Sequence, residues 1–202
     1  MRKLWIFILL VLFAESSRAQ KYQLFSPDQK LSAEVEITPA IQVKLLKNNV
    51  ELLRMSGLSL QVEGNVPDFT RLQVKKVTRK SVSEQVKPVI RERANQYTNQ
   101  YNEMQVAFKS GVAIDFRLFD EGLAYRFSTS LKDSMTIQKE NLSIHLADGD
   151  SIRYQPSRSF NSSYETPYEF RPVSGIGNGE LSHLPALIQK KDGPFVMITE
   201  AD

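Results

Sequence analysis

The apolar residues of this chain recur with a period of two rather than 3.6, and this period limits the possible fold more than any other feature. The clearest example is the run 31–37, LSAEVEI, in which alternate side chains are apolar. Runs 58–62 and 104–108 alternate in the same way. Because successive side chains of a strand point to opposite faces of a sheet, these runs are typical of half-buried strands.

Further short apolar runs continue this pattern along the chain, and turn-forming residues such as Asp120-Glu121-Gly122 separate them. No stretch of a dozen residues has apolar side chains at the 3.6-residue spacing of an amphipathic helix. Many short strands at a spacing of roughly 8 to 12 residues predict an all-β fold with little helix, either an antiparallel sandwich or a barrel. The additional predicted strands are 41–46, 72–77, 112–119, 123–130, 142–146, 187–190 and 195–199.

Residues 1–19 have the features of a secretory signal peptide. Arg2 and Lys3 precede the uncharged apolar run 4–14, and Ser17 and Ala19 occupy the positions expected before a cleavage site. The apolar run has 11 residues, whereas about 20 are needed to cross a bilayer. No cysteine is available for a lipid anchor. We therefore expect an exported protein, periplasmic or secreted, without a membrane anchor, and a mature domain of residues 20–202.

Length and charge narrow the class of protein further. The chain has 202 residues, which is enough for one domain with its own core, and it has no cysteine, so disulfides cannot hold it. Its 26 Lys and Arg against 23 Asp and Glu give a formal net charge of +3. No basic stripe follows from this composition, and we expect no nucleic-acid partner.

Two segments interrupt the strand pattern. Residues 91–102 are polar and aromatic, and we expect a strand pair joined by a polar loop, with a Tyr- and Asn-bearing sugar-binding loop as the alternative. Residues 154–180 are rich in proline, glycine and aromatic side chains. Loops of this length are uncommon without a function, so we expect a long ordered loop that packs on a neighbour.

Motifs for catalysis are mostly missing. There is no G-x-S-x-G sequence, and His145 and His183 have no evident third group to orient them. The sequence Asp148-Gly149-Asp150 lacks the later ligands of a calcium loop and is interpreted as a hairpin turn. Glu165 and Glu169 are candidates for a glycosidase carboxylate pair by residue type alone. Glu200 and Asp202 follow the apolar run 195–199, as acids at a strand end or at the entrance to a further site.

The order of several motifs resembles the N-terminal domain of glycoside hydrolase family 97, the exported α-glucosidases and α-galactosidases of Bacteroidetes. The resemblance extends from Ser26 to Asp202, and its most specific part is FDEGLAYRF, with its tight turn at 120–122. The matching segments are LFSPDQKLSAEVEI, GLSLQVEG, QYNEMQVAF, FRLFDEGLAYRF, SSYETPYEF and FVMITEAD.

This resemblance implies a large antiparallel β-sandwich, of the super-sandwich type, that packs on a catalytic (β/α)8 barrel and closes one side of its sugar pocket. The family's catalytic carboxylates lie on the barrel, which this sequence does not contain, so no catalytic residue is assigned and the isolated chain is expected to be inactive. Glu200, in the terminal Glu-Ala motif, is implied as a calcium ligand. Calcium takes six to eight oxygens, so this cofactor is expected only together with the barrel.

Two other functions remain open at this stage. One is a free-standing module that binds an α-linked oligosaccharide, with Tyr97, Tyr101, Tyr164 or Tyr168 as stacking platforms. The expected sugar-contact residues are Tyr164, Glu165 and Tyr168. The other is an assembly module whose 154–180 segment binds a second protein.

Overall fold

The computed structural model describes residues 20–38, 40–65, 67–69, 72–90, 94–163 and 165–200. Within these ranges the chain forms strands and two short 3-10 turns, η1 (Glu63–Asn65) and η2 (Val173–Gly175). The strands are β1 (Gln20–Phe25), β2 (Leu31–Ile37), β3 (Ile41–Lys47), β4 (Val50–Val62), β5 (Val74–Val86), β6 (Tyr97–Phe108), β7 (Val112–Leu118), β8 (Leu123–Thr129), β9 (Ile137–His145), β10 (Ser151–Ser157), β11 (Glu169–Pro172), β12 (Leu181–Gln189) and β13 (Phe195–Ile198).

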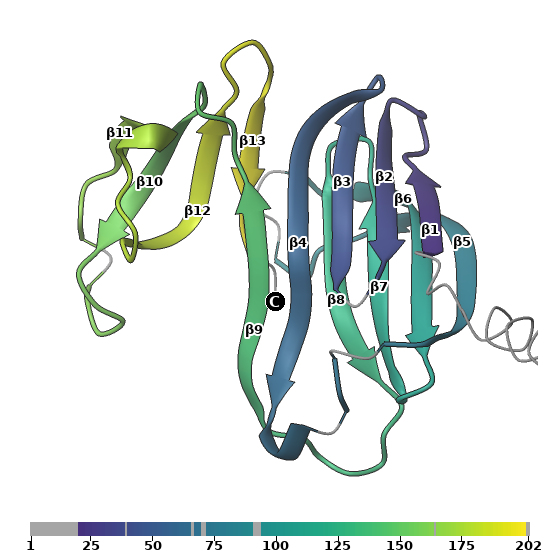
Figure 1. Cartoon of the computed structure of the whole chain (residues 1–202). Coiled ribbons are helices and arrows are strands. Elements are labelled where there is room, and N and C mark those ends of the chain that lie inside the picture. The colour runs from purple at the N-terminus through teal and green to yellow at the C-terminus, as the bar shows by residue number, and fades with distance from the viewer. Residues whose placement is uncertain are drawn as a thin grey trace, which may run out of the picture.

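These strands form three antiparallel sheets. Sheet A has the order β1-β2-β3-β4-β9, sheet B the order β5-β6-β7-β8, and sheet C the order β11-β10-β12-β13. Sheet B lies behind sheet A, and sheet C lies beyond β9 at the edge of sheet A (Figure 1). The predicted all-β fold is confirmed, and of the two alternatives the sandwich is the one observed.

The main core lies between sheets A and B. Val35 and Val43 of sheet A and Ile114 and Phe116 of sheet B are fully buried in one apolar cluster. Each is one of the alternate apolar residues of its strand. Because side chains alternate along a strand, their polar neighbours point away from the partner sheet. The period-two pattern of the sequence therefore determines which face of each sheet is buried.

Sheet C joins the same core by one face. Ile188 of β12 is fully buried in the main cluster, and Val196 and Ile198 of β13 pack against it. The next residues along β13, Phe195 and Met197, point the other way and are more than half exposed. Sheet C therefore extends the sandwich sideways and leaves Phe195 and Met197 on its outer face.

Two predictions about irregular segments are wrong. Segment 154–180 is not a single long loop, because it contains the end of β10, all of β11 and the turn η2. The prolines of this segment argued against strands, but Pro156 lies within β10 and Pro172 ends β11. Residues 148–150 do form a turn, in which the Asp150 N–H donates to the Ala147 carbonyl. It is not a hairpin, because β9 pairs with β4 and β10 pairs in sheet C.

Other predictions fall partly or wholly outside the described residues. The predicted signal peptide, residues 1–19, is one of them. In the part of the chain that the structure describes, no helix is long and apolar enough to cross a membrane. The strand pair expected within 91–102 is wrong: the described part of this range holds only the end of a connection, 94–96, and the start of β6, and the partner strand β5 already ends at Val86.

Candidate functional site

One phenol of sheet B is hydrogen-bonded to a carboxylate of sheet A, and the charge of a second carboxylate, beyond β13 of sheet C, also acts on it. The Tyr125 hydroxyl of β8 donates to Oε1 of Glu140 on β9, with 2.6 Å between the oxygens. Glu200, just beyond β13, lies close enough for its charge to act on the same phenol. Burial raises the pKa of Tyr125, and the hydrogen bond to Glu140 and the charges of Glu140 and Glu200 raise it further. Tyr125 thus stays neutral and donates its hydrogen bond to Glu140.

The local sequence explains how these groups come together. The Phe119 N–H donates to the Gly122 carbonyl at 2.9 Å, which closes the turn between β7 and β8 and fixes the register that places Tyr125 opposite Phe116. Glu140 is held opposite Leu60 of β4. β13 pairs along β12 up to Ile198, two residues before Glu200.

The described residues around Tyr125 do not form a complete metal site. No group of three or more His, Cys, Asp or Glu side chains that could hold a metal ion occurs in the described ranges. Carboxylate oxygens are suitable calcium ligands, but two of them fall short of six to eight. Glu200 therefore fits the expected ion only as one ligand among others supplied from outside these residues.

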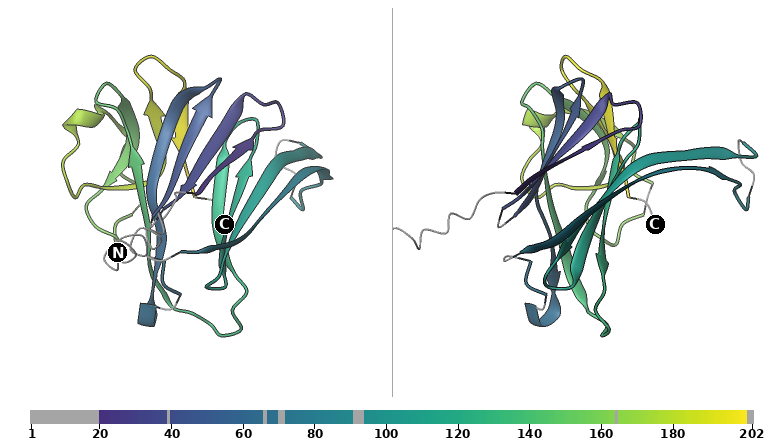
Figure 2. Two further views of the ribbon diagram at one scale, coloured as in Figure 1. Left: turned by 45° about the vertical axis from the view of Figure 1, so that its right-hand side comes forward. Right: turned by 90° about the vertical axis from the view of Figure 1, so that its right-hand side faces the viewer.

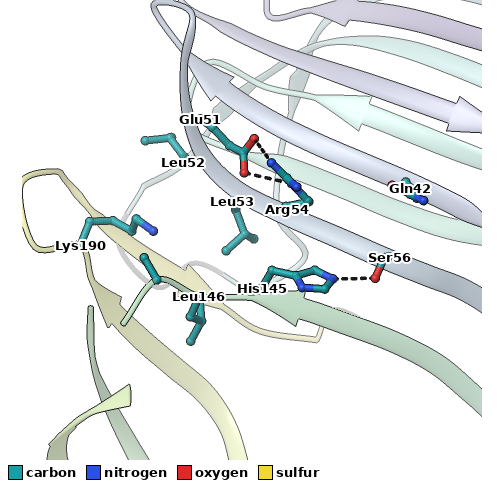
Figure 3. A pocket seen from close by; sticks show the side chains of 10 residues that line it. Gln42, Glu51, Leu52, Leu53, Arg54, Ser56, His145, Leu146 and Lys190 are labelled. Atoms are coloured by element: carbon teal, nitrogen blue, oxygen red, sulfur yellow. Dashed lines mark hydrogen bonds and ion pairs between the residues drawn. The ribbon is translucent and has the colours of Figure 1, made fainter. Parts of the chain in front are cut away.

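A polar groove of about 390 Å³ lies where sheet A meets sheet C. Figure 3 shows His145 at the end of β9 pointing toward Ser56 of β4, and 2.6 Å separates His145 Nε2 from Ser56 Oγ. No local sequence pattern predicts this pair, because 89 positions separate the two residues. Among the described residues no carboxylate is bonded to His145, so the pair lacks the third member of a catalytic triad.

The charged groups that line this groove are already neutralised. Arg54 Nε and Nη2 donate to the two carboxylate oxygens of Glu51 at 3.1 and 2.8 Å. Lys190 Nζ is 2.6 Å from Asp150 Oδ2. The hydrogen bond from Arg54 is the main reason why the pKa of Glu51 is lowered. Because both cations have partners, the groove is a neutral polar surface rather than an anion site.

The predicted sugar-contact residues have different surroundings. Glu165 and Tyr168 are exposed between β10 and β11, and Tyr164 lies outside the described residues. Tyr97 is exposed near the start of β6. The prediction that Tyr101 serves as a stacking platform is wrong: its ring is 5% exposed and is covered by the Arg117 guanidinium, 4.8 Å from the ring centre, and by Phe119.

Glu169, the other predicted glycosidase carboxylate, begins β11 and lies 3.8 Å from Arg171. Arg171 also binds the Tyr154 hydroxyl and Glu180, each at 2.8 Å. The Glu180 carboxylate in turn accepts the Gly177 N–H at 2.7 Å, so this network holds the turn after β11 against β10. The role of these polar groups is to hold the local structure together. This network contains no pair of carboxylates arranged for glycoside cleavage.

Comparison with known proteins identifies the family. Residues 24–202 match the family described as Glycosyl-hydrolase 97 N-terminal. The chain belongs to this family. The resemblance noted in the sequence is thus confirmed, and the super-sandwich of three sheets is the fold of a glycosyl-hydrolase 97 N-terminal domain.

Longer proteins share this domain. A retaining α-galactosidase of Bacteroides thetaiotaomicron is 29% identical over 213 residues, which cover all of this chain and 32% of the relative. Two structures of a glycoside hydrolase family 97 enzyme from Pseudoalteromonas sp. strain K8, in complex with panose and with acarbose, have the same fold. For both the TM-score is 0.72 at 20% identity, over 85% of this chain and 27% of theirs. The chain thus spans about a third of the length of these relatives.

Proposed function

We propose that this chain is the non-catalytic N-terminal β-sandwich of an exported α-glycosidase, and that it packs on a catalytic barrel and completes the barrel's sugar pocket. The observation that carries the proposal is the match of residues 24–202 to an N-terminal domain that makes up only about a third of its relatives. The described residues also offer no triad and no glycosidase carboxylate pair. In this proposal the reaction belongs to the partner domain.

The proposed substrate is an α-linked oligosaccharide. One relative is named a retaining α-galactosidase, and the Pseudoalteromonas enzyme was captured with panose and with acarbose. In this chain Glu165 and Tyr168 are exposed in the segment that also holds Tyr164, and we assign sugar contact to these three residues. A tyrosine ring presents an apolar face to the sugar and a hydroxyl at its edge, which suits a ligand of mixed polarity.

Calcium is proposed as a cofactor of the assembled enzyme. Glu200 supplies one carboxylate ligand, and the remaining ligands come from the catalytic domain. In a calorimetric titration, the isolated chain should then bind calcium no more tightly than the isolated chain with Glu200→Gln. In the assembled enzyme, the same substitution should weaken calcium binding. Equal calcium binding by both forms of the assembled enzyme would remove Glu200 from the ligand set.

Export follows from the proposed signal peptide. Expression of residues 1–202 in a Gram-negative host should yield a product outside the cytoplasm whose first residue is Gln20. N-terminal sequencing of the purified product tests this, and a cytoplasmic product that retains Met1 would contradict it.

The central test is activity. Residues 20–202 should fold, as judged by β-type circular dichroism and a cooperative melt, and should leave aryl α-galactosides and α-glucosides uncleaved. The reading frame beyond Asp202 should encode a barrel, and the longer product should cleave at least one of these substrates. Hydrolysis by residues 20–202 alone, or a frame without a catalytic domain, would overturn the proposal. In the second case, saturable binding of an oligosaccharide would identify a free-standing binding module.

A further inference from the structure

The outer parts of β5 and β6 leave the sandwich as a two-stranded arm. We define the arm as residues 82–86 and 97–101 with the described parts of their connection, 87–90 and 94–96. Figure 2 shows it extending well beyond the body of the molecule. Strands β7 and β8 end near its base, because β7 pairs with β6 only from Asn102 to Ala107. Beyond that point, β5 and β6 have only each other as partners.

An arm of this kind buries too little surface to be stable by itself. Isolated two-stranded hairpins are marginal in water, since they have no sheet or helix to cover a face. Here the strands are linked by local polar pairs, of which the Asn99 amide bound to Glu84 at 2.7 Å and the Gln85 amide bound to Thr98 at 3.0 Å are examples. Exposed pairs of this type contribute little to stability. The extended arm therefore favours a covering partner.

The register gives the arm two different faces. Val82 pairs with Tyr101, Glu84 with Asn99 and Val86 with Tyr97, so that one face carries two apolar and aromatic pairs with one polar pair between them. The alternate pairs 81/102, 83/100 and 85/98 place only Ser, Asn, Gln and Thr side chains on the other face. The apolar character extends past β5, where Ile90 is 75% exposed and Val89 is fully exposed. Exposed apolar groups gathered at the end of a projecting arm are typical of a contact surface.

A second copy of the chain is a poor fit for this surface. The longest open edge of the arm is β5, and pairing of two copies through it would bring two β5 strands side by side. This strand and its continuation carry Lys75, Lys76, Arg79, Lys80 and Lys87 against the single acid Glu84. Lysines along an edge strand oppose pairing between identical chains, because like charges are brought together.

The C-terminal side of the molecule indicates a different partner. In the right-hand view of Figure 2, β13, the last strand that the structure describes, lies on the side of sheet A toward which the arm extends. The family is an N-terminal domain, and two thirds of the relatives' length lies outside the match. A domain that follows residue 202 would therefore begin on the arm's side of the sandwich.

We infer that the arm is an interdomain clasp whose Val86 and Tyr97 face, with Val89 and Ile90, lies against the catalytic domain of the same enzyme. This inference rests on the proposed function and adds the surface through which the two domains meet. Covering the apolar end removes it from water, and the partner replaces the third strand or helix that the arm lacks.

Hydrogen exchange measured by mass spectrometry tests the clasp. The amides of 82–86 and 97–101 should exchange at least about tenfold more slowly in the full-length enzyme than in residues 20–202, whereas those of β2 and β3 should be equally protected in both. In the full-length enzyme, Val86→Asp combined with Tyr97→Asp should remove this difference. The matched control is Val50→Asp, which alters an exposed valine of sheet A and should leave arm exchange unchanged.

The outcomes separate the two proposals. In residues 20–202 the double variant should melt within about 2 °C of the parent, since both side chains are exposed there, and this shows that the variant folds. An active full-length enzyme with an arm that exchanges as fast as in the isolated domain would overturn the clasp and leave the proposed function standing. Concentration-dependent protection in the isolated domain would make a second copy the occupant and would also overturn it. A reading frame without a catalytic domain would overturn both.

Discussion

Asp150 and Lys190 form a buried ion pair that joins two turns at the border of sheets A and C. The Lys190 ammonium lies 2.6 Å from Oδ2 of Asp150, which is only 2% exposed. The same carboxylate accepts the N–H of Ala147 at 3.0 Å and that of Lys191 at 3.2 Å. One side chain thereby satisfies backbone groups after β9 and after β12. It fixes the position of sheet C relative to the strand that carries Glu140.

Removal of this carboxylate should be costly. Asp150→Ala leaves the Lys190 ammonium largely buried without its partner and two N–H groups without an acceptor. We expect a loss of about 2–4 kcal/mol in the free energy of unfolding, measured by urea denaturation. The control Asp148→Ala, on the exposed side of the same turn, should change it by no more than about 0.5 kcal/mol. Equal effects of the two substitutions would refute the structural role of Asp150.

The same ion pair predicts an acid-dependent stability. Burial would raise the pKa of Asp150, but the bond from Lys190 and the two N–H donors outweigh it and lower the pKa below its usual 3.8. A carboxyl with a lowered folded-state pKa stabilises the protein fully above the unfolded-state value and loses this contribution as the pH falls through the folded-state value. The stability difference between wild type and Asp150→Asn should therefore be constant above about pH 5 and shrink below about pH 4. Urea midpoints from pH 3 to 7 measure it, and a constant difference throughout would contradict the assignment.

The core between the two main sheets should tolerate little loss of volume. Phe116 of β7 is fully buried, and its replacement by alanine should lower the free energy of unfolding by about 3–5 kcal/mol. Phe160 offers a matched control, because it is 92% exposed, and Phe160→Ala should cost no more than about 0.5 kcal/mol. A small loss for Phe116→Ala would mean that the sheets are not packed as described.

The sequence predicted best those strands that bury one face. The expected run 31–37 coincides with β2, and 112–119 differs from β7 by one residue. The prediction of 72–77 covered less than half of β5, because residues 78–86 contain only two apolar side chains and have no buried face that would impose a period. Pairing with β6, not burial, keeps them extended. Periodicity detects burial, so it misses strands that lie outside the core.

The candidate site depended on information that local patterns do not carry. The resemblance pointed to Glu200 and to the motif that contains Tyr125, but no local pattern links either residue to Glu140, which comes from another sheet. The same holds for Ser56 and His145. Such pairs arise when strands that are distant in sequence are placed side by side, and the pattern of a single sequence gives no sign of that pairing.

Two glycines should respond oppositely to the same substitution. Gly57 interrupts β4 with a φ of +71°, at the point where the register with β9 shifts between Ser56 and Ser59. A Cβ at this position would meet nothing within 4 Å, so the cost of Gly57→Ala arises from the left-handed backbone alone and should be about 1–2 kcal/mol.

Gly122 also has open space around it, but its φ lies outside that region. Gly122→Ala should therefore be neutral or stabilise by up to about 1 kcal/mol, because it restricts the unfolded chain. Thermal and urea denaturation of both variants would decide the matter, and destabilisation of equal size at the two sites would show that the backbone of β4 does not require glycine at position 57.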